Sequence, residues 1–312
     1  MSKSIIKDYL QRFSAKLLDL LSKQTLKMSF AQKRKFANLL VKLVLPFRFA
    51  RKEFVTATLM ECLHLQRPEA EKLAIKTYET FVLNALEMSG LKYMTSQQIL
   101  DKIEVHGSEH LDEALAIGKG CILVSGHFSL WEFIPHWLAL NGYKMTTVVR
   151  RQNNKYVDQW FEEMRRGHGA MTTDSGFGIR EILKALKKGY CLGLLMDQDN
   201  GKQGIFIKFM EKWASAPTGP AVISIKTGCP LVAMYIFPDY EGKHQLYIYP
   251  PIYTDKYSNN LEDQQRLTQE YSTFHEKIIK EHPEQWFWLH RRWKHQPSDS
   301  PDNLWVKAGL CD

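Results

Sequence analysis

From residue 103 onward the chain alternates short apolar runs with stretches of helical periodicity. Strands and helices that alternate through short turns predict an α/β sheet with helices on its faces. The last two predicted strands are separated only by residues 238–244, which is short enough for an antiparallel hairpin and makes the sheet mixed. The predicted strands are 121–125, 145–149, 190–196, 231–237 and 245–249, and the predicted helices among and after them are 130–140, 156–166, 179–188, 220–226 and 261–280.

Two amphipathic helical patterns, at residues 3–24 and 30–54, precede this region, and a third helix is predicted at 68–91. In the first two, apolar residues recur along one stripe, and lysines and arginines lie beside it. Residues 1–52 hold 13 Lys and Arg against 2 Asp and Glu, a balance of +11; because the whole chain carries +8, the remainder carries −3. The basic charge therefore belongs to an N-terminal arm, which we place at residues 1–54.

A basic arm predicts an anionic partner, for which a membrane surface, a nucleic acid and an acidic protein are the candidates. Basic amphipathic helices with aromatic residues suit the headgroup boundary of an anionic bilayer. Binding to nucleic acid is disfavoured, because the apolar stripes would face phosphates. The remaining alternative is that both helices pack on the body of the protein.

No stretch reaches the roughly 18–20 uninterrupted apolar residues of a membrane-spanning helix. The nearest, residues 36–50, is interrupted by Lys42, Pro46 and Arg48. Charged residues recur through the N-terminal region, unlike in a signal peptide. The five cysteines stand singly, without a C-x-x-C pair, as expected in a reducing compartment. We therefore expect a peripheral protein that stays in the compartment where it is made.

The stretch most indicative of catalysis runs from the strand predicted at 121–125 through Gly126 to His127 and Glu132. Ligands of α/β sheets bind beyond the carboxyl ends of the strands, where His127 is expected. The sequence predicts that Ser129 caps the following helix and that the Glu132 carboxylate folds back to one imidazole nitrogen. Such a carboxylate fixes the tautomer and leaves the other nitrogen as a general base for a hydroxyl. The plainer alternative is a capped helix with a hydrogen-bonded histidine.

Other reaction classes lack their sequence signatures. The chain has no G-x-S-x-G nucleophile elbow, no P-loop and no G-x-G-x-x-G. An acyl-enzyme on serine is therefore unsupported, and direct attack by an acceptor hydroxyl is simpler. His106 and His110 match the H-x-x-E-H spacing of inverted zinc peptidases, but Gly107 keeps them off a common helix face, so we predict no metal site.

Arginines and aspartates expected at the same edge of the sheet are candidate substrate contacts. Arg150 closes the second predicted strand and Asp197 the third, so both are expected on the side of His127. A guanidinium there can bind phosphate or stabilise the oxyanion of a tetrahedral intermediate. Arg165 and Arg166 are further candidates, and a surface ion pair is the alternative for each of the four.

From His127 to Glu132 the sequence resembles the H-x4-D/E signature of the lysophospholipid acyltransferase superfamily. Over about residues 55–295 it is more closely similar to the late acyltransferases of bacterial lipid A biosynthesis, in the lauroyl and myristoyl transferase branch. Supporting motifs occur in the family's order: R-R-Q-N-N from Arg150, Arg165 itself, D-Q-D-N-G from Asp197, G-I-F-I-K-F from Gly204, T-G-P-A from Thr218 and P-E-Q-W-F-W-L-H-R-R-W-K from Pro283.

The resemblance implies an O-acyltransferase with a glycerolipid acyltransferase-like fold: an acyltransferase domain at residues 55–295 and a polar tail at 296–312. It implies an acyl thioester donor, usually acyl carrier protein with acyl-CoA as the alternative, and no other cofactor or metal. The acceptor is expected to be a lipid A-like glycolipid at the cytoplasmic face of the bacterial inner membrane. His127 is expected to take the acceptor proton while Glu132 orients it. The residues implied in substrate binding are Arg150, Asn153, Arg165, Asp197 and Asp199.

The sequence departs from the family pattern at several points. Family members commonly begin with a membrane-spanning helix, where this chain has the basic arm. Arg151, Lys155 and Lys208 stand where prolines are usual. Because extra cations beside the acceptor bear on its identity, lysophospholipids and phosphatidylinositol mannosides are alternative acceptors. A non-catalytic lipid-binding relative is the alternative to an enzyme.

Overall fold

The computed structural model describes residues 3–47, 51–174, 179–239, 243–297 and 300. Its centre is a seven-stranded sheet in the order β1-β9-β8-β2-β5-β3-β4, in which only β8 and β9 are antiparallel neighbours. The predicted α/β fold with a mixed sheet is therefore confirmed. The strands are β1 (Ile103–His106), β2 (Cys121–Ser125), β3 (Met145–Val149), β4 (Met171–Asp174), β5 (Cys191–Leu195), β8 (Leu231–Pro238) and β9 (His244–Ile248).

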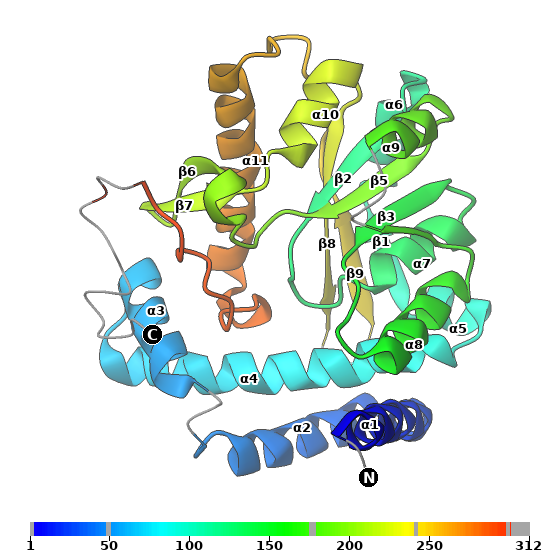
Figure 1. The fold of residues 1–312 in the computed structure, drawn as a ribbon, viewed down its shortest axis with the longest axis vertical. Helices are drawn as coiled ribbons and strands as arrows, with labels where there is room; N and C mark the ends of the chain where they lie inside the picture. The colour runs from blue at the N-terminus through cyan, green and yellow to red at the C-terminus, as the bar shows by residue number, and fades with distance from the viewer. Residues whose placement is uncertain (1–2, 48–50, 175–178, 240–242, 298–299, 301–312) are drawn as a thin grey trace.

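Helices cover both faces of the sheet, because alternate residues of a buried strand point to opposite sides (Figure 1). In β2, Ile122 and Val124 belong to one hydrophobic cluster, to which α9, α10 and α11 contribute. Cys121 and Leu123 belong to the other, to which α5, α6, α7 and α8 contribute. These helices are α5 (Ser96–Asp101), α6 (Ser108–Ala116), α7 (Phe133–Leu140), α8 (Lys155–Arg166), α9 (Ile179–Lys187), α10 (Gly219–Thr227) and α11 (Leu261–Glu281).

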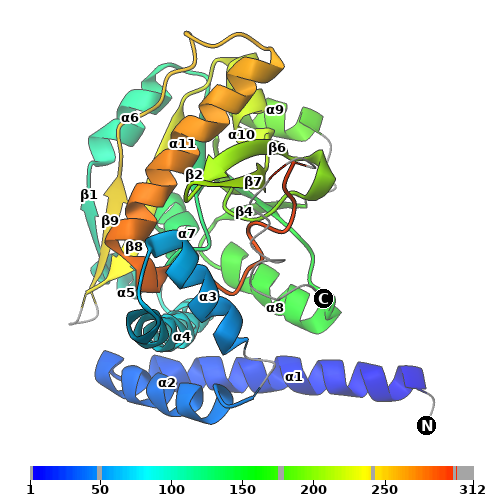
Figure 2. The same cartoon turned by 90° about the vertical axis from the view of Figure 1, so that its left-hand side faces the viewer.

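The sequence patterns did not predict β4, α5 or the separate hairpin of β6 (Ile205–Phe209) and β7 (Lys212–Ala216). This hairpin packs against α11 (Figure 2). Side chains of that helix satisfy the free edge of β6: Gln269 bonds both backbone groups of Lys208, at 2.8 and 2.7 Å, and Gln265 donates to the Phe206 carbonyl at 2.7 Å. The edge strand is thus paired by a helix and not by another strand.

Four helices precede the sheet: α1 (Lys3–Leu26), α2 (Phe30–Val44), α3 (Lys52–Leu63) and α4 (Arg67–Ser89). The single helix predicted at 30–54 is wrong, since α2 ends before Pro46, which cannot donate the next helical hydrogen bond. The arm boundary predicted at residue 54 falls inside α3. Most of the tail predicted at 296–312 lies outside the described residues.

The α1 helix lies with α2 beneath α4 and presents its apolar stripe away from the body (Figure 2). Its inner side is held by polar contacts: the Trp160 indole donates to Asp19 at 3.0 Å, and the Tyr156 hydroxyl donates to Asp8 at 3.0 Å. The residues of the outward stripe are 46–64% exposed; they include Tyr9, Leu10, Phe13, Leu17 and Leu20. The helix therefore packs on the body through these polar contacts together with Leu18 and Leu26, and it leaves the apolar stripe in solvent.

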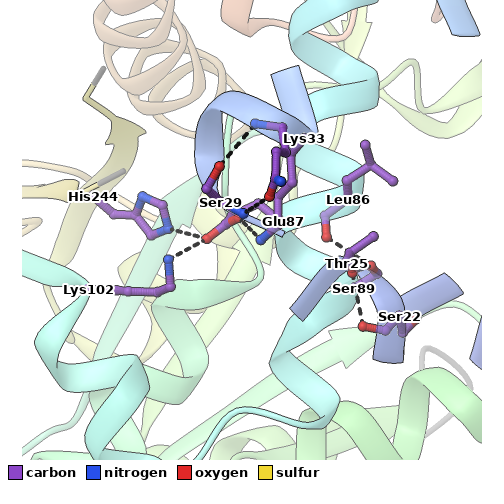
Figure 3. A network of polar contacts seen from close by, with 10 residues as sticks. Ser22, Thr25, Ser29, Lys33, Leu86, Glu87, Ser89, Lys102 and His244 are labelled. Carbon is purple, nitrogen blue, oxygen red and sulfur yellow. Dashed lines mark hydrogen bonds and ion pairs between the residues drawn. The ribbon is translucent and has the colours of Figure 1, made fainter. Parts of the chain in front are cut away.

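A buried ion-pair network joins α2 to α4 (Figure 3). Glu87 is 1% exposed, and its carboxylate lies 2.5 Å from Lys33 Nζ of α2, 2.8 Å from Lys102 Nζ and 3.3 Å from His244 Nε2. Burial opposes the charged carboxylate, but the hydrogen bond of His244 and the charges of the two lysines hold the pKa of Glu87 well below its usual range. The helix α2 is thereby fixed to the body, because separating Lys33 from Glu87 would leave a buried charge without a partner.

Replacing Glu87 by glutamine is expected to lower the free energy of unfolding by about 3–5 kcal/mol, because Lys33 would remain buried without a counter-charge. Urea unfolding at pH 7 measures the change. The control is Glu53→Gln, which removes an exposed ion pair with Arg67 and is expected to change stability by less than about 1 kcal/mol. Equal effects of the two substitutions would contradict a stabilising role of the network.

Candidate active site

His127 and Asp197 meet because they follow two parallel strands that pair in register. Ser125, the last residue of β2, pairs with Leu195, the last residue of β5, and each functional residue comes two positions later. The Asp197 carboxylate accepts the His127 backbone N–H at 2.8 Å through Oδ2, and its Oδ1 lies 2.9 Å from His127 Nδ1. The carboxyl edge of the sheet thus builds a histidine–carboxylate pair.

Close packing at Gly126 lets this pair form. A Cβ atom at Gly126 would lie 2.4 Å from Cε1 of His275 and 3.0 Å from the carboxyl carbon of Asp197. Both distances are too short for a side chain, and His275 is fully buried, so it has little room to move. Glycine is therefore required at position 126, where the backbone leads from β2 to His127 and any side chain would collide with His275 and Asp197.

The contact predicted between Glu132 and His127 is wrong: among the described residues, the carboxylate on the imidazole is that of Asp197. Glu132 instead accepts two hydrogen bonds from Arg165, Nε to Oε2 at 3.0 Å and Nη2 to Oε1 at 2.5 Å. The reason is local, because residues 129–132 form a turn in which Ser129 has φ 53°. Ser129 does not cap the helix either, since α7 begins at Phe133 with Glu132 at its N-cap.

The electrostatics of the pair favour a basic imidazole. Burial disfavours the imidazolium of His127, but the charge and hydrogen bond of Asp197, with a smaller contribution from Glu132, raise the pKa of His127 above its ordinary value. Burial would raise the pKa of Asp197, but the charge and hydrogen bond of His127 hold it well below its usual range. With Nδ1–H donating to the Asp197 carboxylate, Nε2 is left as the acceptor, and among the described residues only the Gln198 amide approaches it, at 3.4 Å.

A cavity of about 450 Å³ opens beside His127. Its polar lining lies beyond the strand ends and includes Arg150, Arg165 and Gln198, together with Glu132. Its apolar lining comes mostly from the strands and α7, and includes Leu123, Ile134, Pro135, Met145, Val148, Leu194 and Met234 together with Gly193. One cavity therefore brings together an imidazole, two guanidinium groups and an apolar interior.

Three of the predicted substrate contacts lie outside the lining of this cavity: Asp197, which pairs with His127, and Asp199 and Asn153. Asp199 is already engaged by His295, whose Nδ1 lies 2.6 Å from Oδ2, and by the Gly201 N–H at 3.1 Å. Asn153 is exposed, and its carbonyl accepts a hydrogen bond from Gln11 of α1 at 3.4 Å. Each of these residues stabilises the surrounding chain in this structure.

Sequence reasoning missed two buried neighbours of Asp197. The Trp286 indole donates to Asp197 Oδ2 at 2.9 Å, and His275 Nε2 lies 4.0 Å from the same oxygen. Trp286 stands in the P-E-Q-W-F-W motif, which was a signal for the family but gave no indication of what the tryptophan contacts. His275 lies in α11, far along the sequence from His127, and no local pattern marks it.

The family described as bacterial lipid A biosynthesis acyltransferase matches residues 7–295 of this chain. The chain belongs to this family. It is therefore an O-acyltransferase. Within the described ranges, none of its helices combines the length and apolar character that crossing a bilayer requires.

Relatives of this acyltransferase differ in the acceptor that their names give. The lipid A biosynthesis lauroyltransferase of Escherichia coli (strain K12) is 27% identical over 264 residues, which cover 83% of this chain and 84% of that protein. The E. coli lipid A biosynthesis palmitoleoyltransferase is 27% identical over 233 residues, covering 73% and 74%. The phosphatidylinositol mannoside acyltransferase of Mycobacterium tuberculosis (strain ATCC 25618 / H37Rv) is 25% identical over 232 residues, covering 73% and 71%. The acceptors named for all three are glycolipids.

Replacing Asp197 by asparagine is expected to lower kcat by roughly 10²–10⁴-fold, because an amide cannot hold the required tautomer of His127. Without the Asp197 charge, burial dominates and the pKa of His127 falls, so the acid limb of the pH–rate profile moves to lower pH. The control is Asp199→Asn, the same change two residues away, which does not touch His127. If both variants shift the profile alike, the pairing of Asp197 with His127 is not what sets it.

Proposed function

We propose that this enzyme moves a fatty acyl chain from a thioester donor, first among the candidates acyl carrier protein, to a hydroxyl of a lipid A-like glycolipid. The observation that carries the proposal is the opening of His127 Nε2, oriented by Asp197, onto a cavity that has both guanidinium groups and an apolar interior. Family membership and the named acceptors of the relatives support the glycolipid class.

In this scheme His127 Nε2 takes the proton of the acceptor hydroxyl while its oxygen attacks the thioester carbonyl. Asp197 stabilises the imidazolium that forms. The tetrahedral intermediate then collapses to the ester, and the departing thiolate recovers the proton from His127, so the products are an acylated lipid and a free thiol. An acyl-serine intermediate has no support, because the hydroxyl of Ser125, which lines the cavity, donates to the Met234 carbonyl at 2.8 Å.

Glu132 acts in this scheme through Arg165. Its two hydrogen bonds hold the guanidinium at the cavity wall. Burial lowers the pKa of Arg165, but the hydrogen bonds and charge of Glu132 outweigh this effect, so the pKa of Arg165 is raised and the guanidinium stays charged. A fixed guanidinium can bind an acceptor phosphate or the oxyanion of the intermediate, and Arg150 lines the same cavity. The scheme calls for no metal and no cofactor besides the donor thioester.

The apolar part of the cavity is proposed to hold the acyl chain. A Cβ atom at Gly193 would lie 2.8 Å from Cε of Met145 and 3.0 Å from Cγ2 of Thr147, two residues of the lining. The absence of a side chain at Gly193 thus leaves these residues in place along the wall. An apolar channel between buried strands suits a hydrocarbon chain, since burial there removes each methylene from water.

The reaction is tested by following a labelled acyl chain from acyl carrier protein and from coenzyme A to lipid A precursors, lysophospholipids and phosphatidylinositol mannosides. Transfer to a lipid A precursor is expected, and His127→Ala is expected to abolish it without changing the circular dichroism spectrum. Transfer to a phosphatidylinositol mannoside instead would reassign the acceptor. Undiminished transfer by the His127 variant would sink the general-base scheme.

We also propose that α1 and α2 rest on an anionic membrane, at the cytoplasmic face of the bacterial inner membrane. The outward apolar stripe of α1 continues in exposed Leu39 and Leu43 of α2, and Lys7 and Lys16 are exposed beside it. Apolar side chains flanked by cations fit the headgroup boundary of an anionic bilayer.

The α1 helix also contacts the loop between β3 and α8, which leads to the cavity. The Asn154 amide donates to the Gln11 carbonyl at 3.1 Å and to the Ser14 hydroxyl at 2.9 Å, both on α1. Arg150 and Gln152, in the preceding loop, line the cavity. A lipid acceptor standing in the bilayer would therefore reach His127 from the side on which α1 lies.

The triple variant Leu10→Ser, Leu17→Ser and Leu20→Ser is expected to bind anionic vesicles at least about tenfold more weakly, as measured by co-sedimentation. The reason is that three apolar side chains lose their burial in the bilayer. The control carries serine at Ile117, Ile179 and Leu261, which are 41%, 52% and 71% exposed and lie outside α1 and α2. Equal vesicle binding by the two triple variants would show that the α1 stripe is not the membrane contact.

A further inference from the structure

The segment at residues 285–287 holds the loop that carries the catalytic histidine. It forms a short antiparallel bridge with residues 127–129, in which the loop donates one backbone hydrogen bond of 2.9 Å and accepts another of 3.2 Å. The two segments are far apart in sequence, so the C-terminal motif fixes the backbone on both sides of Phe128. The position of the His127 backbone thus depends on a segment that follows the last long helix.

The same segment supplies a hydrogen bond to the catalytic carboxylate. Trp286 Nε1 donates to Asp197 Oδ2 at 2.9 Å, beside the His127 backbone N–H that donates to the same atom at 2.8 Å. With Oδ2 held by two donors, rotation of the carboxylate would break both bonds. Oδ1 is therefore left aimed at His127 Nδ1, 2.9 Å away.

In the described part of the chain, no other side chain stands ready to replace the indole N–H of Trp286 as a donor to Asp197. Trp286 is 2% exposed and packs against Trp288 at 4.6 Å and Phe209 at 5.7 Å between ring centroids. On the far side of Asp197, the fully buried His275 makes its hydrogen bond to Tyr235, at 2.7 Å, and stays 4.0 Å from the carboxylate. Among the described side chains, only those of His127 and Trp286 donate hydrogen bonds to Asp197.

We propose that Trp286 is a positioning residue of the acyl transfer, whose indole N–H locks the Asp197 carboxylate in the orientation that makes His127 a general base. The inference rests on the proposed function and assigns a task at that site to the tryptophan of the P-E-Q-W-F-W motif. The hydrogen bond of Trp286 also lowers the pKa of Asp197, which agrees with donation to the charged carboxylate. Trp286 does not line the cavity, so it acts only through Asp197.

Trp286→Phe is expected to lower kcat by about 10–100-fold and to change KM by less than about twofold, as for other outer partners of a catalytic group. Loss of the indole donor leaves more of the Asp197 charge acting on the imidazole, so the pKa of His127 rises. NMR titration of the His127 ring measures this rise, and the acid limb of the pH–rate profile follows it. A kcat and a His127 titration like those of the wild type would overturn the proposal.

The matched control is Trp293→Phe, because Trp293 is fully buried and donates its indole N–H to the Phe209 carbonyl at 2.9 Å, away from Asp197. Both variants are expected to lose similar thermal stability, and only the first to change the His127 titration. Equal changes in both would reduce Trp286 to a packing role and overturn the proposal.

If Trp286→Phe does not fold, benzothienylalanine at position 286 keeps the shape of the indole and replaces its N–H by sulfur, and the same titration decides. The titration needs no substrate. A shifted His127 pKa in a protein that transfers no acyl chain would support the positioning of Asp197 and overturn the proposed function. An unshifted His127 pKa in an enzyme that transfers the acyl chain would overturn the positioning role of Trp286 and support the proposed function.

Discussion

The in-register pairing of β2 with β5 is the constraint on which the site depends. Both strands are central in the sheet and packed on both faces, so a slip of one residue would turn buried side chains toward the wrong cluster. Because burial of all of β2 and of the first residues of β5 fixes the register, the positions two residues beyond the strand ends are fixed as well. His127 and Asp197 therefore meet through the backbone ladder of the core, and the adjoining loop adds only the final alignment.

Two buried carboxylates serve the site through different partners. Asp197 pairs with the imidazole of His127, and Glu132 pairs with the guanidinium of Arg165, so each buried carboxylate has its own partner. Separate pairing lets one cavity present a proton acceptor and a permanent cation without mutual neutralisation. The spacing from His127 to Glu132 in the sequence reflects the length of the turn between β2 and α7, which delivers both residues to the same cavity.

The sequence was sufficient for β2, β3, β5, β8 and β9 and for the edge at which the site lies, because buried strands appear as apolar runs. It was insufficient for the partner of His127. That partner depends on the left-handed conformation of Ser129, which turns Glu132 toward α8, and on a register that can be counted only once β2 and β5 are known to be neighbours. The hairpin of β6 and β7 escaped prediction for a related reason, since its edge is satisfied by glutamines of α11.

The burial of Lys33 against Glu87 has a consequence for how the enzyme selects among lipids. Because α2 cannot leave α4 without stranding a charge, the α1 and α2 layer and the cavity move as one body. With this layer resting on a bilayer, the height of His127 above the headgroups is a constant of the fold. In the proposed membrane-bound arrangement, acceptors would be sorted by the elevation of their hydroxyl as well as by their chemistry, and the N-terminal helices would work as a spacer between the membrane and the reacting atoms.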